Sequence, residues 1–371
     1  MIMKTYLPFA VLIFLFVLDS CSSGKGALKQ GDYYSAVSQA VARLRQNPDH
    51  KKSKEVLRTS YKMAVDYLET DAQNQITSNA NFKWSNAVQN YESINNLYEQ
   101  IRTSPGALTV VPNPINKYKE LTEVKSKAAE ETYEAGIQAM LKNTREDAKR
   151  AYFLFSDANN FYPGYRESIE MIEQSKYNAT IKVVVDPSIQ NYYDWNFEPV
   201  IFGVRPSQFV KFYTPREANE ANLQRVDQFV KVVVNTYSEG RPTTTKRVET
   251  FKDSVKVSEK TVNNQKVPVY EKVTASMTFF EKSITSRGSI TLYIKDATSN
   301  AELRNSDIIS EERWSDRWAT CTGDLRALSE ANKKMCGLKE PYMARDFLRN
   351  QTKKELDNKL TNTLSGFYNQ Y

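Results

Sequence analysis

The chain has 371 residues, of which 40% are hydrophobic and 26% charged, and its formal net charge is +7. This is the composition of an ordinary globular protein, and it excludes collagen-like and largely disordered chains. The single histidine, His50, excludes zinc sites built on two or three histidines, and three cysteines cannot form a four-thiolate site. We therefore expect no metal or other cofactor, and the length predicts two domains.

The N-terminus has the pattern of an export signal. Lys4 gives a positively charged start, and an apolar run follows from Tyr6 to Leu18. This run is shorter than the roughly 20 residues that a membrane-spanning helix needs. Residues 1–20 are therefore predicted to be a cleaved signal peptide.

The end of this segment reads Leu18-Asp19-Ser20-Cys21. It resembles the lipobox of bacterial lipoproteins, in which an aliphatic residue and two small residues precede the cysteine that is lipidated. Asp19 departs from that pattern, because its position is usually small and uncharged. The resemblance implies that Cys21 carries acyl chains such as palmitate and that residues 21–26 form a tether. A plain secretory signal with a chance cysteine is the alternative.

The residues after the cysteine bear on the destination. In many lipoproteins an aspartate directly after the lipidated cysteine retains the protein in the inner membrane, and this chain has Ser22 there. The resemblance therefore implies an outer-membrane lipoprotein. Acidic residues that direct some lipoproteins to the cell surface are absent before Asp32. We expect a lipid anchor in the outer membrane, a chain facing the periplasm, and no nucleic-acid partner.

Residues 27–177 are predicted to form paired helices. Apolar residues recur at helical spacing, and in three segments a small residue is followed at that spacing by larger apolar residues. These segments centre on Ala36, Ala87 and Ala148. The pattern resembles the tetratricopeptide repeat, which implies helical hairpins with a concave surface for a peptide or protein segment. The alanines are spaced more widely than the roughly 34 residues of that repeat, so an unrelated helical bundle is the alternative.

Residues 178–371 begin with apolar spacing of two, which predicts strands. The hairpin expected over 243–265 is polar on both faces and partly exposed. Helical patterns return around Trp314 and again from Pro341. The order of helices, strands and helices predicts an α+β fold whose second domain has a mainly antiparallel sheet. The predicted strands are Ala179–Val185, Gln228–Tyr237, Val267–Phe280 and Gly288–Ile294.

An unusual cluster contains Arg313, Trp314, Arg317 and Trp318. We expect a helix here, on which residues four apart share a face. The indoles would then stack on a sugar ring or a partner, and the arginines would bind carboxylates, so that the cluster forms a platform for a partner or ligand. The alternative is a pair of tryptophans that anchor the core beside a solvated row of charges.

Two further features concern covalent chemistry. Cys321 and Cys336 are candidates for a disulfide in an oxidising compartment. An unbroken helix between them would hold them about 22 Å apart, beyond disulfide reach, so the bond requires the intervening chain to fold back. Asp253-Ser254-Val255 matches an acid-hydroxyl-aliphatic sequon that some Gram-negative bacteria O-glycosylate, which makes Ser254 a candidate site.

Motifs of catalysis are missing from the sequence. It contains no phosphate-binding loop, no nucleophile elbow and no H-E-x-x-H, and His50 is expected in a surface turn. We therefore expect a non-enzymatic, lipid-anchored scaffold that holds other envelope proteins in an outer-membrane assembly, secretion or motility complex. The alternative is a periplasmic module that binds cell-wall glycan, namely peptidoglycan, or another anionic polymer, which suits the positive net charge.

Overall fold

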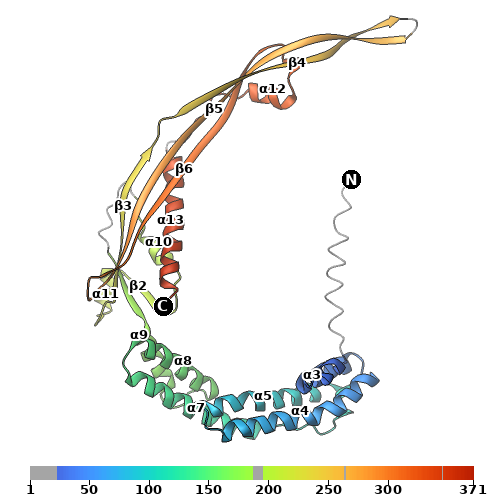
Figure 1. Ribbon diagram of the computed structural model, residues 1–371, viewed down its shortest axis with the longest axis vertical. Helices are drawn as coiled ribbons and strands as arrows, with labels where there is room; N and C mark the ends of the chain where they lie inside the picture. The colour runs from blue at the N-terminus through green and yellow to red at the C-terminus, as the bar shows by residue number, and fades with distance from the viewer. Residues whose placement is uncertain (1–22, 187–194, 263–264, 345) are drawn as a thin grey trace. The chain divides into compact units, whose positions relative to one another are not determined.

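The computed structural model describes residues 23–186, 195–262, 265–344 and 346–371 (Figure 1). The chain divides into two compact units, Met1–Ala179 and Thr180–Tyr371. Helices form the described part of the first unit, and a six-stranded sheet with C-terminal helices forms the second. The predicted α+β fold is therefore confirmed. Among the helices of the described ranges, none combines the length and the apolar composition that a membrane span requires.

The first unit is a succession of helices in which each main helix packs against the next. Contacts join α3 to α4, α4 to α5, α5 to α7, α7 to α8 and α8 to α9. This arrangement of sequence neighbours is typical of helical-hairpin arrays. The helices are α2 (Lys25–Lys29), α3 (Tyr33–Gln46), α4 (Lys51–Thr77), α5 (Lys83–Arg102), α6 (Pro105–Leu108), α7 (Tyr118–Leu141), α8 (Arg145–Phe161) and α9 (Ser168–Ala179).

Side chains cap the starts of α3 and α4. The Asp32 carboxylate accepts a hydrogen bond from the Ser35 backbone N–H at 3.0 Å, and this bond lowers the pKa of Asp32 below its usual value. His50 stands directly before α4, where its Nδ1 accepts from the Ser53 backbone N–H at 3.3 Å. The imidazole therefore serves as a helix cap in the turn between α3 and α4.

Small residues set the separation of the packed helices. Ala36 and Ala87 are fully buried, and Ala148 is 5% exposed. Gly136 in α7 faces Phe155 of α8, and a Cβ added to the glycine would lie 2.7 Å from the phenyl ring. These helices therefore approach more closely than larger side chains would permit.

Replacing Ala87 by tryptophan tests this packing. We expect Ala87→Trp to lower the free energy of unfolding by about 1–3 kcal/mol, because a buried site without spare volume is overpacked. Gln89→Trp is the matched control, since Gln89 is exposed on the same helix. Urea denaturation of both variants measures the difference, and equal stability would contradict the close crossing.

The second unit is built on a mixed sheet with the strand order β2-β1-β3-β5-β4. Strand β1 runs parallel to β2 and β3, whereas the remaining pairs are antiparallel. Strand β6 pairs with the other side of β5. The elements are β1 (Ile181–Val185), α10 (Glu198–Gly203), β2 (Val210–Tyr213), α11 (Pro215–Glu220), β3 (Gln228–Glu239), β4 (Thr243–Val262), β5 (Gln265–Asp296), β6 (Glu302–Gly323), η3 (Leu325–Ala327), α12 (Glu330–Cys336) and α13 (Phe347–Tyr368).

Strand β5 corrects the sequence prediction, because its 32 residues join the two strands expected over Val267–Phe280 and Gly288–Ile294. One edge of β5 pairs with β4 over Gln265–Ser283 and then with β3 over Ser286–Asp296. The hairpin expected within 243–265 is wrong in extent, because Thr243–Val262 is the single strand β4, and the hairpin is formed by β4 with the first half of β5.

The buried side of β5 changes along its length. Near one end the odd-numbered Val273, Ala275 and Met277 are buried, and they lie beneath η3. Toward the other end the even-numbered Ile290 and Leu292 are buried in the core that α13 covers. Two segments with opposite apolar parity therefore belong to one strand, which explains why the sequence pattern divided it.

Helix α13 covers the core at the even face. Its buried leucines at positions 348, 356, 360 and 364 form the stripe expected for the final amphipathic helix. Gly288 of β5 lies beneath it, and an added Cβ would lie 2.7 Å from Cγ2 of Thr352. The glycine therefore allows the helix to lie close to the sheet.

Candidate functional site

The candidate site is a β-ribbon that continues from the sheet, and we define it as Thr243–Val262 of β4, Gln265–Ser283 of β5 and Ser315–Gly323 of β6 (Figure 1). β6 ends at Gly323, which is paired with Ala275. The ribbon therefore has three strands next to the sheet, and only β4 and β5 continue from there to its tip. Side chains alternate between its two faces, and residues paired across strands share a face.

One face, which we call the covered face, is packed against η3 and α12. Val273 and Ala275 of β5 form a small core with Ala327 and Leu328. The chain turns back after Gly323, so that Cys336 at the end of α12 meets Cys321 of β6 in a disulfide with a Cα–Cα distance of 5.7 Å. The fold-back that this bond requires is present, because a short 3₁₀ turn and a short helix replace a continuous helix.

Ion pairs neutralise the covered face. Glu281 of β5 binds Arg313 and Arg317 of β6, with N–O distances of 3.3 and 2.9 Å. Arg326 of η3 binds Glu271 at 2.9 Å and also pairs with Asp324. Hydrogen bonds from the Arg326 side chain lower the pKa of Asp324 below its usual value. All three carboxylates therefore have a cationic partner within the chain.

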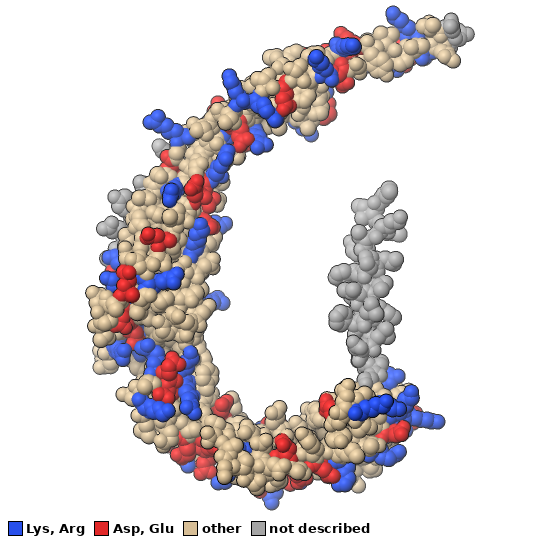
Figure 2. Space-filling model, in the orientation of Figure 1, with Lys and Arg blue, Asp and Glu red and all other residues tan. Residues whose placement is uncertain are grey.

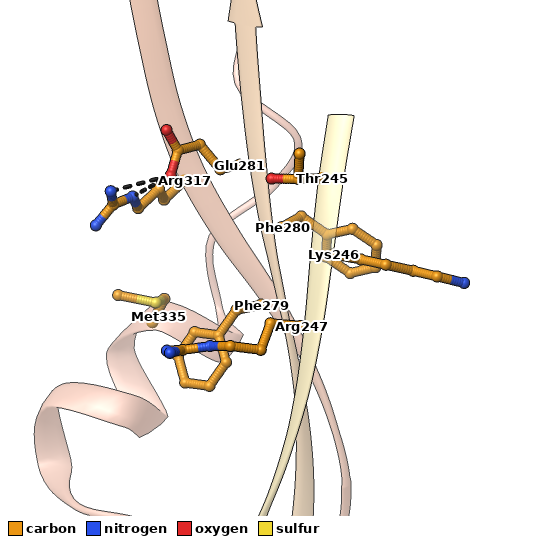
Figure 3. A pocket seen from close by; sticks show the side chains of 8 residues that line it. All are labelled: Thr245, Lys246, Arg247, Phe279, Phe280, Glu281, Arg317 and Met335. Carbon is orange, nitrogen blue, oxygen red and sulfur yellow. Dashed lines mark hydrogen bonds and ion pairs between the residues drawn. The ribbon is translucent and has the colours of Figure 1, made fainter. Parts of the chain in front are cut away.

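A cavity of about 650 Å³ lies beside these ion pairs (Figure 3). The Arg247 guanidinium lies 5.2 Å from the Phe279 ring centroid and 3.0 Å from a Glu249 oxygen. The close-up shows Arg317 and Met335 on the opposite side of the strands from Lys246. The arginines of this cavity are thus held by carboxylates of the chain itself. The lining residues are Thr245, Lys246, Arg247, Phe279, Phe280, Glu281, Arg317 and Met335.

The opposite face of the ribbon, which we call the open face, is rich in lysine, hydroxyl and aromatic side chains. Val248 is 61% exposed and Tyr270 is 60% exposed. Phe280 and Trp318 are paired across strands, and their rings stack at a centroid distance of 5.0 Å. The members of the open face are Thr244, Lys246, Val248, Thr250, Lys252, Ser254, Lys256, Glu259 and Thr261 of β4, Lys266, Pro268, Tyr270, Lys272, Thr274, Ser276, Thr278, Phe280 and Lys282 of β5, and Asp316, Trp318, Thr320 and Thr322 of β6.

Three lysines of the open face have no carboxylate partner. Lys256 and Lys266 pair with Glu259, and Lys282 pairs with Glu340. In the described ranges no carboxylate forms an ion pair with Lys246, Lys252 or Lys272. Basic side chains project along the ribbon in Figure 2. The open face is therefore positively charged, while the covered face is neutralised by its own ion pairs.

The predicted platform of two arginines and two tryptophans is divided between these faces. The expected helix is wrong, because all four residues lie in strand β6. Arg313 and Arg317 lie on the covered face with Glu281, whereas Trp314 and Trp318 lie on the opposite face. Both tryptophans are partly exposed, so neither is a fully buried anchor of the core. Residues four apart share a face in a strand as well as in a helix, so the two arginines lie together and so do the two tryptophans. The arginine pair and the tryptophan pair nevertheless lie on opposite faces and do not act on one surface.

The other predicted sites can be placed briefly. Ser254 is exposed on β4, where the open face makes its hydroxyl accessible. Cys21 and the signal peptide lie outside the described residues. Within the described ranges, no group of three histidine, cysteine or acidic side chains is arranged to hold a metal ion.

Sequence reasoning missed the open-face lysines as a set. It predicted that the segment 243–265 is polar on both faces, which did not distinguish one face from the other. The available signal was parity: Lys246, Lys252 and Lys272 have even numbers, whereas Glu249 and Glu271 have odd numbers. Only the pairing register of β4 with β5 shows that this parity is kept across both strands.

No protein-family model matches the sequence, and no curated protein matches it significantly.

The disulfide is expected to stabilise the ribbon. The two cysteines are 15 residues apart in sequence. A closed loop of that length is worth about 3 kcal/mol, because it limits the unfolded chain. We expect the Cys321→Ala/Cys336→Ala variant to lose about this amount in a urea titration of the second unit. Dithiothreitol should destabilise the wild type but leave the variant unchanged, and a wild type insensitive to the reductant would contradict the role.

Proposed function

We propose that the protein is a non-enzymatic scaffold that is lipid-anchored at the outer membrane, faces the periplasm and holds other envelope proteins in an assembly, secretion or motility complex. The observation that carries the proposal is the amount of chain devoted to the ribbon. β4 pairs with β5 from Thr243 to Val262, and nearly all of β4 remains exposed. Exposed backbone and side chains of this extent suit contact with another macromolecule.

The contacts that stabilise the ribbon from its covered face support the same proposal. A two-stranded ribbon is marginally stable in water by itself. Here the disulfide, α12 and the ion pairs of Glu271 and Glu281 stabilise it from one side and leave the other side free. The helical array of the first unit adds a second surface, on which Tyr67 of α4 is 64% exposed. A rigid ribbon loses little conformational entropy when it binds, which favours stable association.

The lipid anchor is proposed from the sequence around Cys21. Two or three acyl chains bind a bilayer stably, since each buried CH₂ contributes about 0.8 kcal/mol. We expect Cys21→Ser to accumulate as an uncleaved precursor or to leave the outer-membrane fraction, as judged by fractionation and gel mobility. Ser20→Ala keeps a small residue before the cysteine and should behave as the wild type. Mature Cys21→Ser protein in the outer membrane would exclude the anchor.

The partners can be sought in cells with the full chain. A photoreactive side chain in place of Tyr67 or Tyr270 should crosslink to a fixed set of envelope proteins, identified by mass spectrometry. Tyr342, which is 87% exposed and lies outside the ribbon and the helical array, is the control position. Crosslinks equally frequent from Tyr342 would contradict specific binding. Co-sedimentation with peptidoglycan and no protein crosslinks would favour the glycan-binding alternative.

A further inference from the structure

The two faces of the ribbon differ in charge because they carry different charged residues. In the paired part of β4 and β5, Glu249, Asp253, Glu271 and Glu281 lie on the covered face. The open face has lysines at positions 246, 252, 256, 266, 272 and 282 and two acidic side chains, Asp316 and Glu259, so lysines predominate there. Lysines protect free strand edges against pairing with other chains, but they do so from either face. Edge protection alone therefore does not require that the lysines share one face.

The lysines form an extended row. Lys246 and Lys256 are ten residues apart on one strand, which corresponds to about 33 Å. Lys272 is paired with Ser254 and so lies between Lys252 and Lys256 on the neighbouring strand. A compact anion would reach at most the diagonal neighbours Lys252 and Lys272, and Lys246, six residues from Lys252 along the strand, would lie beyond it. An extended polymer with repeated negative groups would reach all of them at once.

Hydroxyl groups fill the space between the lysines. Thr250, Ser276 and Thr322 are paired across the three strands in one row, and Thr278 pairs with Thr320 in the next. Each hydroxyl can donate and accept a hydrogen bond, as sugar hydroxyls require. The rings of Tyr270 and Trp318 offer amphipathic surfaces for the apolar faces of sugar rings.

The shape of the ribbon favours a flexible polymer over a flat membrane as the ligand of the open face. Strands twist, and two-stranded ribbons twist more than wide sheets. A row of side chains along such a ribbon does not stay in one plane, so a flat bilayer would meet only part of it. A flexible polymer can follow the twist.

From these observations we infer that the open face binds an extended polyanionic glycan, held by Lys246, Lys252 and Lys272 and by the hydroxyl and aromatic side chains between them. This goes beyond the proposed scaffold function, because it needs no protein partner. The negative groups of the glycan take the place of the carboxylates that the covered face supplies to its own arginines.

The test uses the purified full chain and polygalacturonate, a carboxylated polysaccharide, as the probe. We expect Lys246→Gln/Lys252→Gln/Lys272→Gln to bind about tenfold more weakly than the wild type, with a shallower dependence of affinity on salt. The control Lys51→Gln/Lys52→Gln/Lys119→Gln removes the same charge from exposed positions of the first unit and should bind as the wild type does. Equal weakening in both variants, or no binding by the wild type, would overturn the inference.

Two further measurements identify the occupant. Lys246→Arg/Lys252→Arg/Lys272→Arg should restore binding, which shows that charge rather than folding was lost. Tyr270→Ser should weaken binding to polygalacturonate but not to polyglutamate. Tighter binding of the wild type to polyglutamate would indicate an acidic protein. Tighter binding to vesicles of equal parts phosphatidylcholine and phosphatidylglycerol would indicate a membrane. Either result would exclude a glycan as the occupant.

Discussion

Strand β5 pairs with β3 and β4 on one edge and with β6 on the other, and this continuous ladder of 32 residues holds the second unit together. The ladder joins a well-packed core beneath α13 to a ribbon that has a core on one face alone. Because backbone hydrogen bonds carry the strand through the change, its buried side can switch parity without a break. Every feature of the candidate site follows from that switch, which leaves the even-numbered side chains of the ribbon uncovered.

The covered face explains how an extended ribbon persists with so little core. Few apolar side chains are buried there, so the disulfide between Cys321 and Cys336 and the ion pairs of Glu271 and Glu281 supplement them. These ion pairs are partly exposed, and each contributes little by itself. Their placement has a second consequence, because these carboxylates bind arginines, and Lys246, Lys252 and Lys272 on the other face have no ion pair with a carboxylate in the described ranges. The ion pairs of the covered face thus both stabilise the ribbon and cause its two faces to differ in charge.

The helical unit is governed by a different constraint, which is the close approach of helices at small residues. Buried alanines such as Ala36 and Ala87, and Gly136 against Phe155, let neighbouring helices approach closely. Each helix contacts mainly its neighbours in sequence, so the unit depends on local contacts. In the second unit the sheet depends on pairings between distant segments, such as Gln228 with Asp296.

The sequence by itself determined the fold class, the helices of residues 27–177, the strand character of the exposed segment 243–262 and the last amphipathic helix, because apolar spacing reports directly on local structure. It also made Cys321 and Cys336 candidates for a disulfide. The tertiary structure decided that Arg313 to Trp318 form a strand, that β5 is one strand, and that Cys321 meets Cys336. Only the register of β4 on β5 and β6 decided which face each lysine and tryptophan occupies. The physical reason is that a strand has two faces but does not encode which of them a distant helix will cover.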